Sequence, residues 1–236
     1  ASFVPKRAGA RPLAPEGAGP VRFTDVTEAA GLLRAVNVSG SAHDKQLILE
    51  EMGGGAAFFD YDHDGWLDIF LVNGTSLDPS VRDRRPRSYL FHNNRDGTFT
   101  DVTEKAGLGH SGWGQGGCVG DYDNDGFDDP SGTHGGKNVL YRNNGDGTFT
   151  DVSEKAGVAG APGRWGAGCC FLDYDRDGHL DLYVASYLNY DPAGAPKLGQ
   201  AAYCLYNDIP VPCGPLGFAG GTNALWGHKA DCAFPS

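Results

Sequence analysis

Three nine-residue segments of the chain concentrate the carboxylates that could do chemistry. Each segment has aspartate at its first, third, fifth and ninth positions and glycine at its sixth. Two like charges about 4 Å apart repel each other by roughly 4 kcal/mol at an effective dielectric constant of about 20, so this spacing predicts a cation among them. The segments span residues 60–68, 121–129 and 173–181.

The type of donor atom indicates which cation this would be. Carboxylates and an inward-turned backbone carbonyl at the seventh position are hard oxygen donors, which suit Ca²⁺ better than zinc or copper. The glycine at the sixth position allows the sharp turn that folds the later residues back toward the ion. We therefore expect one Ca²⁺ per loop, three in all. The expected ligands are Asp60, Asp62, Asp64, Trp66 and Asp68; Asp121, Asp123, Asp125, Phe127 and Asp129; and Asp173, Asp175, Asp177, His179 and Asp181.

Two alternatives explain the same aspartates differently. An EF-hand loop also begins Asp-x-Asp-x-Asp-Gly, but it needs a glutamate at its twelfth position and a helix on each side. Here the twelfth position is Leu71, Gly132 or Val184. The flanking runs are short, apolar and bounded by glycine and aspartate, which is typical of strands. The other alternative, solvated acidic turns without a metal, stays open.

The composition favours an all-β fold. The chain has 236 residues, of which 37 are Gly and 14 are Pro, and this suits many short strands joined by tight turns. The formal net charge is −11 and the sequence has no basic stripe, so we expect no nucleic-acid partner. No apolar run approaches the roughly 18 residues of a membrane helix, so we expect no membrane span.

The cysteines indicate an oxidising compartment. Cys204 and Cys213 flank a proline-containing loop, and we expect them to form a disulfide. Cys118, Cys169 and Cys170 lie in strand-like runs, where a thiol acts as a small apolar filler, and either oxidation state is open for them. No signal peptide is visible at the start of the sequence. The calcium loops and the disulfide together lead us to expect a secreted, extracellular protein.

A second recurring phrase completes the repeating unit. Thr-Phe-Thr-Asp-Val, followed by Glu-Lys-Ala-Gly one residue later, stands at 98–107 and 148–157. Each copy follows an Asn-Asn-x-Asp-Gly segment, which predicts a tight β-hairpin. The unit therefore reads inner strand, calcium loop, second strand, third strand, hairpin and fourth strand. The first aspartate of the loop recurs after 61 and then 52 residues, a period in the range of propeller blades.

The repeats predict the domain organisation. We expect an all-β fold of about three β-propeller-type blades, each with four antiparallel strands and a calcium loop. Residues 1–20 are expected to form an extended N-terminal arm, and 21–236 the repeat region. Pro130 is expected to weaken the second strand of the second blade. The blades are expected at about 52–104, 113–154 and 165–226, the last without its fourth strand, and 22–27 as an orphan fourth strand.

The two phrases together resemble a known repeat family. The aspartate loops, coupled to Leu-Tyr-Arg-Asn-Asn-Gly-Asp-Gly-Thr-Phe-Thr-Asp-Val, are similar to the FG-GAP or VCBS repeats of integrin-α-type β-propellers. They look closest to bacterial extracellular proteins and cartilage-acidic-protein relatives that carry an ASPIC/UnbV module. The resemblance covers roughly 21–226, although the literal Phe-Gly/Gly-Ala-Pro phrase is absent. It implies calcium-binding blades that use the ligand positions given above, in propellers that usually close with about seven blades.

These patterns lead to an expected function. The sequence contains no serine-hydrolase elbow, zinc-protease or phosphate-loop motif, so we expect no enzyme. We expect a secreted calcium-binding structural or adhesive protein, with an extracellular protein or polysaccharide as a partner. Three blades do not close a propeller, so either the chain is a fragment of a longer protein or copies assemble into a homo-oligomer or filament by strand exchange, and we expect the assembly. The alternative is a calcium-dependent polysaccharide-binding or polysaccharide lyase module. Its groove would be lined by Tyr187, Tyr190, Tyr203 and Tyr206.

Overall fold

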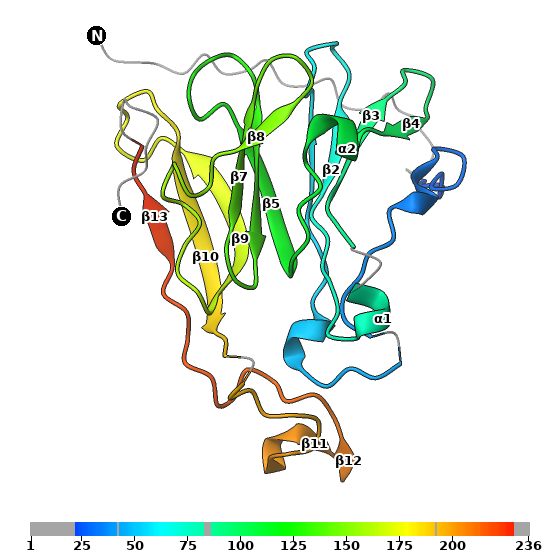
Figure 1. The fold of residues 1–236 in the computed structure, drawn as a ribbon, viewed down its shortest axis with the longest axis vertical. Coiled ribbons are helices and arrows are strands. Elements are labelled where there is room, and N and C mark those ends of the chain that lie inside the picture. The colour runs from blue at the N-terminus through cyan, green and yellow to red at the C-terminus, as the bar shows by residue number, and fades with distance from the viewer. Residues whose placement is uncertain (1–21, 42, 83–85, 192, 229–236) are drawn as a thin grey trace, which may run out of the picture.

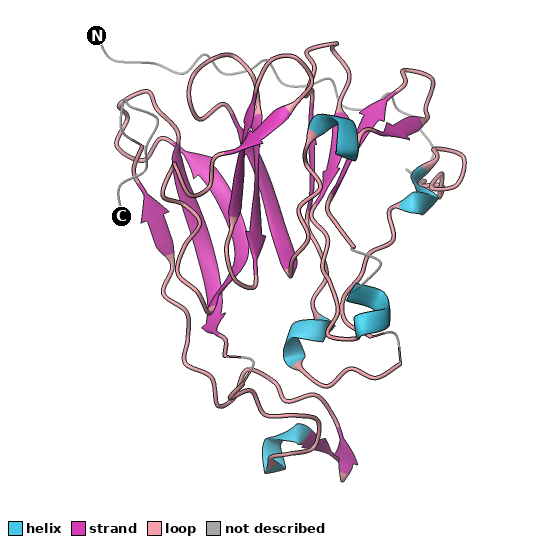
Figure 2. Cartoon of the chain, in the orientation of Figure 1, coloured by secondary structure: helices cyan, strands magenta, loops and turns pink. Residues whose placement is uncertain are grey.

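The sheets of the chain stand side by side (Figures 1 and 2). The computed structural model describes residues 22–41, 43–82, 86–191 and 193–228. The arm predicted at 1–20 lies outside the described residues. Two sheets have four strands and a third has three, with all named strand pairs antiparallel. This confirms the prediction of an all-β fold with four-stranded, propeller-like blades.

Blades 1 and 2 have the same simple topology, in which each strand pairs with the next one along the chain. The tight hairpins predicted from the Asn-Asn-x-Asp-Gly segments join the third and fourth strands of both blades. Blade 1 contains β1 (Ala56–Phe59), β2 (Asp68–Leu71), β3 (Tyr89–Asn93) and β4 (Phe99–Asp101); blade 2 contains β5 (Gly114–Gly120), β6 (Asp129–His134), β7 (Val139–Asn143) and β8 (Phe149–Asp151).

Blade 3 contains three strands among the described residues, and the expected lack of a fourth strand stays a prediction. They are β9 (Arg164–Leu172), β10 (Asp181–Asn189) and β13 (Ala224–Trp226). The insertion between β10 and β13 carries the hairpin of β11 (Leu205–Tyr206) and β12 (Ile209–Pro210). A disulfide joins Cys204 to Cys213 across this hairpin, which confirms the predicted pair.

The helices in the described ranges are short connections. None is long and apolar enough to cross a membrane. They are η1 (Leu32–Arg34), η2 (Ile48–Glu51), α1 (Pro79–Arg82), α2 (Thr103–Ala106) and η3 (Ala202–Cys204).

Residues 22–27, expected as an orphan fourth strand, form no strand within the single described chain, and their pairing as a strand stays a prediction. A strand is defined by a hydrogen-bonded neighbour, and within the described part of the chain no strand pairs with this segment. The turn after it nevertheless has the form of the turn after β4. The N–H of Ala30 donates to the carbonyl oxygen of Val26 over 2.7 Å, as that of Ala106 donates to Val102 over 2.8 Å. The phrase encodes its turn locally, whereas its strand requires a partner.

Apolar clusters between successive blades hold the sheets together. Phe149 from β8 of blade 2 packs edge-on against Phe59 of blade 1, with ring centroids 6.3 Å apart. Tyr122, Leu140 and Trp226 belong to a second cluster, between blades 2 and 3. Each blade therefore buries its faces against its neighbours, which is how a repeat array builds a core.

Small residues on the inner strands allow the blades to approach closely. A side chain at Gly55 would place its Cβ 2.7 Å from the backbone nitrogen of Gly117 in the next blade. A Cβ at Gly116 would lie 2.9 Å from the Cα of Gly168 on β9. These contacts leave no room for a side chain, which confirms why glycine recurs at the entry to each inner strand.

Pro130 changes blade 2 less than predicted. It lies within β6 opposite Val119 of β5, and the strand forms over six residues. The ladder from β6 to β7 begins at Ser131 and Leu140, one residue later than the corresponding ladder from β2 to β3 in blade 1. Proline removes one N–H donor, so its effect is confined to this ladder.

Candidate metal centres

The three aspartate loops occupy the same place in each blade. They connect β1 to β2, β5 to β6 and β9 to β10, and they lie at the same end of the blades, the upper end in Figure 1. In each loop, oxygens from the first, third and ninth aspartates lie within 4.8 Å of one another. The three groups are Asp60, Asp62 and Asp68; Asp121, Asp123 and Asp129; and Asp173, Asp175 and Asp181.

The turn of each loop depends on its own carboxylates. In the first loop, the carboxylate of Asp60 accepts hydrogen bonds from the N–H groups of Asp64 and Gly65, at 2.9 and 2.8 Å. Asp64 in turn accepts one from Trp66 over 2.8 Å. The other loops repeat all three bonds. The glycine at the sixth position has φ of 88–94°, which confirms the left-handed turn expected from its lack of a Cβ.

The ninth aspartate is the buried anchor of each loop. Asp68 is fully buried, and its carboxylate accepts hydrogen bonds from Tyr61 in the loop, over 3.1 Å, and from Asn93 at the end of β3, over 2.7 Å. Asp129 and Asp181 are bonded to the corresponding residues of their blades. This carboxylate therefore fixes the loop to the third strand.

Burial makes two of these anchors, Asp68 and Asp129, costly to ionise in the absence of a cation. Burial raises the pKa of Asp129 to about 8, although the N–H groups of Asn143 and Tyr122 partly oppose this shift. Burial also raises the pKa of Asp68. A cation beside such a group stabilises its charged form. Three close carboxylates, one of them buried, thus form a donor set that fits a hard divalent ion such as Ca²⁺.

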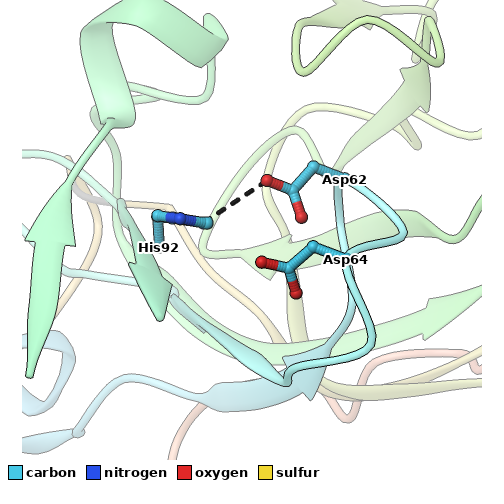
Figure 3. Close-up of side chains that lie close together, drawn as sticks. All are labelled: Asp62, Asp64 and His92. Carbon is cyan, nitrogen blue, oxygen red and sulfur yellow. Dashed lines mark ion pairs between the residues drawn. The ribbon is translucent and has the colours of Figure 1, made fainter. Parts of the chain in front are cut away.

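Basic side chains from the third strand and the hairpin face two of the clusters. Arg142 pairs with Asp123 at 2.6 Å and with Asp125 at 2.9 Å. In blade 1, Nδ1 of His92 lies 3.4 Å from both Asp62 and Asp68, and Figure 3 shows the imidazole facing Asp62. Arg95 pairs with Asp64 at 2.7 Å. No ion pair to the third cluster is found among the residues that the structure describes.

A family comparison agrees with this arrangement. The model of the FG-GAP-like repeat matches residues 60–129 and 131–184, just over half of the chain. The chain belongs to the FG-GAP repeat family. The first match begins at the first aspartate of loop 1 and ends at the last aspartate of loop 2, and the second match contains loop 3. No curated protein matches the chain. The narrower likeness to ASPIC/UnbV proteins stays an expectation.

The predicted ligand positions of the FG-GAP loops do not all lie equally close together in the structure. The structure brings together the first, third and ninth aspartates of every loop. Asp64 groups instead with Asp62 and His92, while Asp125 and Asp177 lie outside the close groups. The assignment of all these residues, and of the carbonyl groups at the seventh position, as metal ligands stays a prediction.

The basic neighbours of the FG-GAP loops were missed from the sequence. His92 and Arg142 occupy equivalent positions of the third strand, two residues before the turn that closes each hairpin. This shared place in the repeat was the available signal. This signal can be interpreted only once the structure shows that the hairpin folds over the loop.

The four tyrosines suggested for a polysaccharide groove do not share one environment. Tyr187 and Tyr190 pack edge-on against the buried Trp165, with centroids 5.5 and 5.6 Å from it. Tyr203 and Tyr206 belong to the β11–β12 insertion and are 43% and 69% exposed. Half of the set thus contributes to the core of this FG-GAP repeat array.

Proposed function

We propose that this chain is an extracellular structural module in which each of the three aspartate loops binds one Ca²⁺. The observation that carries the proposal is the recurrence of the same three-carboxylate group in all three loops. Each donor is a hard oxygen, and each group includes one buried carboxylate whose ionised form a cation would stabilise. The family match supports the proposal, because its two segments contain the loops.

Calcium would act by bracing each blade. The ninth aspartate links the loop to the third strand, so an ion held by it and by the first and third aspartates would tie together the strands on either side of the loop. A site at about 100 times its dissociation constant adds about 2.7 kcal/mol to folding stability. Three such sites would contribute on the order of 8 kcal/mol, which is comparable to the stability of a whole domain, about 5–15 kcal/mol.

A calcium titration tests this function directly. Calorimetry on the full chain should give three sites, and Asp175→Ala should leave two. Asp146→Ala is the matched control, because this aspartate lies in the β7–β8 hairpin, where it accepts hydrogen bonds from Thr148. Three sites are expected to remain in that variant. Unchanged stoichiometry in Asp175→Ala would overturn the ligand assignment.

The extracellular location rests on two supporting features. The Cys204–Cys213 disulfide needs an oxidising compartment to persist. Low-affinity calcium sites in extracellular modules fill at about 10⁻⁴–10⁻³ M, a concentration found outside cells. Detection of the mature chain in the medium of its native source, with this disulfide intact, would support the proposal; retention in the reducing cytosol would overturn it.

The second part of the proposal is that copies of the chain assemble through the surfaces at the two ends of the blade array. Tyr61 and Tyr122, at the second position of their loops, are 7% and 2% exposed because the next blade covers them. Tyr174, at the same position of the last loop, is 54% exposed. At the other end of the array, Phe23 is 97% exposed, whereas Phe149 at the same place in the phrase is 8% exposed. Both ends thus present surfaces that are buried inside the array.

The N-terminal phrase is positioned like the end of a preceding blade. The N–H of Phe99 on β4 donates to the carbonyl oxygen of Ala30 over 2.9 Å, and Gly31 lies against the Phe99 carbonyl much as Gly107 lies against that of Phe149. We propose that residues 23–26 of one copy pair with β13 of another, along the edge that has no partner strand among the described residues, and so complete blade 3 by strand addition. Such head-to-tail contacts produce a ring or a filament.

Light scattering, with calcium and then with excess chelator, tests the assembly. Assembly by the full chain in calcium supports strand exchange, and loss of assembly on deletion of residues 1–26 locates the exchanged strand. A calcium-bound monomer whose segment 22–30 is readily cleaved by protease would overturn self-assembly. The calorimetric titration tests the calcium sites independently of this assembly.

A further inference from the structure

Two cysteines face each other between blades 2 and 3. Cys118 lies on β5 and Cys169 on β9, the first strands of their blades. Both side chains pack against the same apolar cluster, which contains Leu140, Leu182 and Trp226. Both are free thiols in the structure. A thiol pair therefore spans the joint between these two blades.

The alternation of side chains along each strand explains why these two cysteines share a face. Successive residues of a strand point to opposite sides. Val119 packs against the cluster between blades 1 and 2, so its neighbour Cys118 faces blade 3. Cys170 is exposed, so its neighbour Cys169 faces blade 2. Cys170 therefore points away from Cys118.

The distances across the joint are short. Ser131 is the cross-strand partner of Cys118, and the Sγ of Cys169 lies 3.9 Å from the carbonyl oxygen of this same serine. The backbones of β5 and β9 approach so closely that a Cβ at Gly116 would lie 2.9 Å from the Cα of Gly168. Gly116 and Cys118 are two residues apart and share one face of β5, so the thiols meet where the two strands are in contact.

We propose that Cys118 and Cys169 form a disulfide that joins blades 2 and 3 covalently. The chain already carries one disulfide, between Cys204 and Cys213, so its fold is compatible with oxidising conditions. This bond would be independent of calcium. It would hold together one joint of the array.

The oxidant is a low-molecular-weight disulfide, which exchanges with the two protein thiols in two steps. The thiolate of Cys169 attacks one sulfur of the oxidant and releases one small thiol. The resulting mixed disulfide is attacked by Cys118, which releases the second small thiol. Two protein thiols are oxidised to one disulfide, and one small disulfide is reduced to two thiols.

The order of these steps follows from the surroundings of Cys118. A hydrogen bond with the Cys169 thiol and burial both raise the pKa of Cys118, which keeps it protonated. The thiolate is the attacking form, so Cys118 is the slower first nucleophile and acts as the resolving cysteine.

Peptide mapping of the full chain tests the proposal. The protein is incubated with oxidised glutathione, blocked with an alkylating agent under denaturing conditions, digested and analysed by mass spectrometry without reduction. A crosslinked peptide pair containing Cys118 and Cys169 is expected. Alkylation of both cysteines while Cys204 and Cys213 remain bonded would overturn the proposal, as would a bond from either one to Cys170 or Cys232.

Thermal unfolding gives a second readout. Oxidation should raise the midpoint of the wild-type chain by roughly 5–15 °C, because the bond closes a long loop in the unfolded state. The same treatment should leave the midpoint of the double variant Cys118→Ser, Cys169→Ser unchanged. Cys170→Ser is the matched control and should retain the full shift. An equal rise in the double variant would contradict the assignment.

Discussion

The imidazole ring of His63 stacks on the phenyl ring of Phe127, with centroids 4.4 Å apart and planes inclined by 22°. His63 is the fourth residue of the first loop, and Phe127 is the seventh residue of the second. The same two positions meet at the next junction. There, Nδ2 of Asn124 donates to the carbonyl oxygen of Gly178 over 3.1 Å and lies 3.0 Å from Nδ1 of His179. Adjacent loops are thus joined through fixed positions of the repeat.

This contact predicts that neighbouring calcium sites are coupled. Asn124 lies between two expected ligands of the second loop, and His179 supplies the expected carbonyl ligand of the third. Disabling the third loop with Asp175→Ala should weaken calcium binding at the second by roughly fivefold, a coupling of about 1 kcal/mol. In an Asn124→Ala background the same change should have no effect. Calorimetric titration of the wild type, the two single variants and the double variant checks this; an equal loss in both backgrounds would contradict the coupling.

Arg142 is predicted to compete with calcium. Its guanidinium pairs with Asp123 and Asp125 and would have to be displaced or shared when an ion binds. Because Arg142 is 44% exposed, solvent screens these pairs, and Arg142→Ala should raise the affinity of the second loop by no more than about fivefold. Lys137→Ala is the control, since Lys137 pairs with Glu154 outside the loops. Weaker calcium binding in Arg142→Ala would show instead that the arginine supports the site.

Two tyrosines at the same position of the repeat are predicted to differ in how much their substitution by alanine destabilises the fold. Tyr61 is 7% exposed, so Tyr61→Ala should cost about 3–5 kcal/mol of unfolding free energy, as for other large core side chains. Tyr174 is 54% exposed, so Tyr174→Ala should change the stability of a single copy by less than about 0.5 kcal/mol.

Urea denaturation at low protein concentration, with calcium fixed, measures both effects. In concentrated solution, Tyr174→Ala should also weaken assembly, which light scattering detects. Equal stability losses in the two variants would contradict the view that the neighbouring blade decides their burial.

His134 is predicted to make the fold sensitive to mild acid. Burial lowers the pKa of His134 to about 3, and burial also lowers that of His110, whose ring lies 4.6 Å from it. The unfolded chain binds a proton below a pH of about 6.5, whereas folded His134 stays neutral until about pH 3. Stability should therefore fall as the pH drops from 7 to 5, by about 2 kcal/mol for His134 alone.

The variant His134→Asn checks this dependence. Asparagine keeps a donor for the carbonyl of Gly132 but does not titrate, so the fall in stability between about pH 7 and pH 5 should be smaller by the amount assigned to His134. His43→Asn, at an exposed position, should leave the dependence unchanged. Parallel pH profiles for wild type and His134→Asn, measured by urea denaturation, would contradict the prediction.

The sequence by itself determined the features that depend on neighbouring residues. The loop turns follow from Asp60, Gly65 and their repeats, because a carboxylate that accepts nearby N–H groups and a glycine with positive φ are local requirements. The hairpins and the Cys204–Cys213 bond are local in the same sense. The repeat period then predicted the blades, since identical local units form the same sheet.

Only the tertiary structure decided which identical positions are buried. Tyr61, Tyr122 and Tyr174 stand at the same place in their loops, and the presence or absence of a next blade sets their exposure. Phe149 is buried because it packs on Phe59 and Tyr61 of the preceding blade, whereas Phe23 at the same place in the phrase is 97% exposed. Likewise, the effect of Pro130 on strand pairing could not be predicted from sequence, because it depends on which neighbouring strand would accept the hydrogen bond of the missing N–H.

The contacts between distant loops also required the three-dimensional fold. His63 and Phe127 are 64 residues apart, and neither has a local signal that predicts their stacking. Cys118 and Cys169 meet because β5 and β9 converge at the joint between two sheets, whereas the sequence shows only two cysteines in separate strands. Local chemistry shapes each blade, but packing between blades decides which side chains meet, because it depends on how separate sheets are oriented in space.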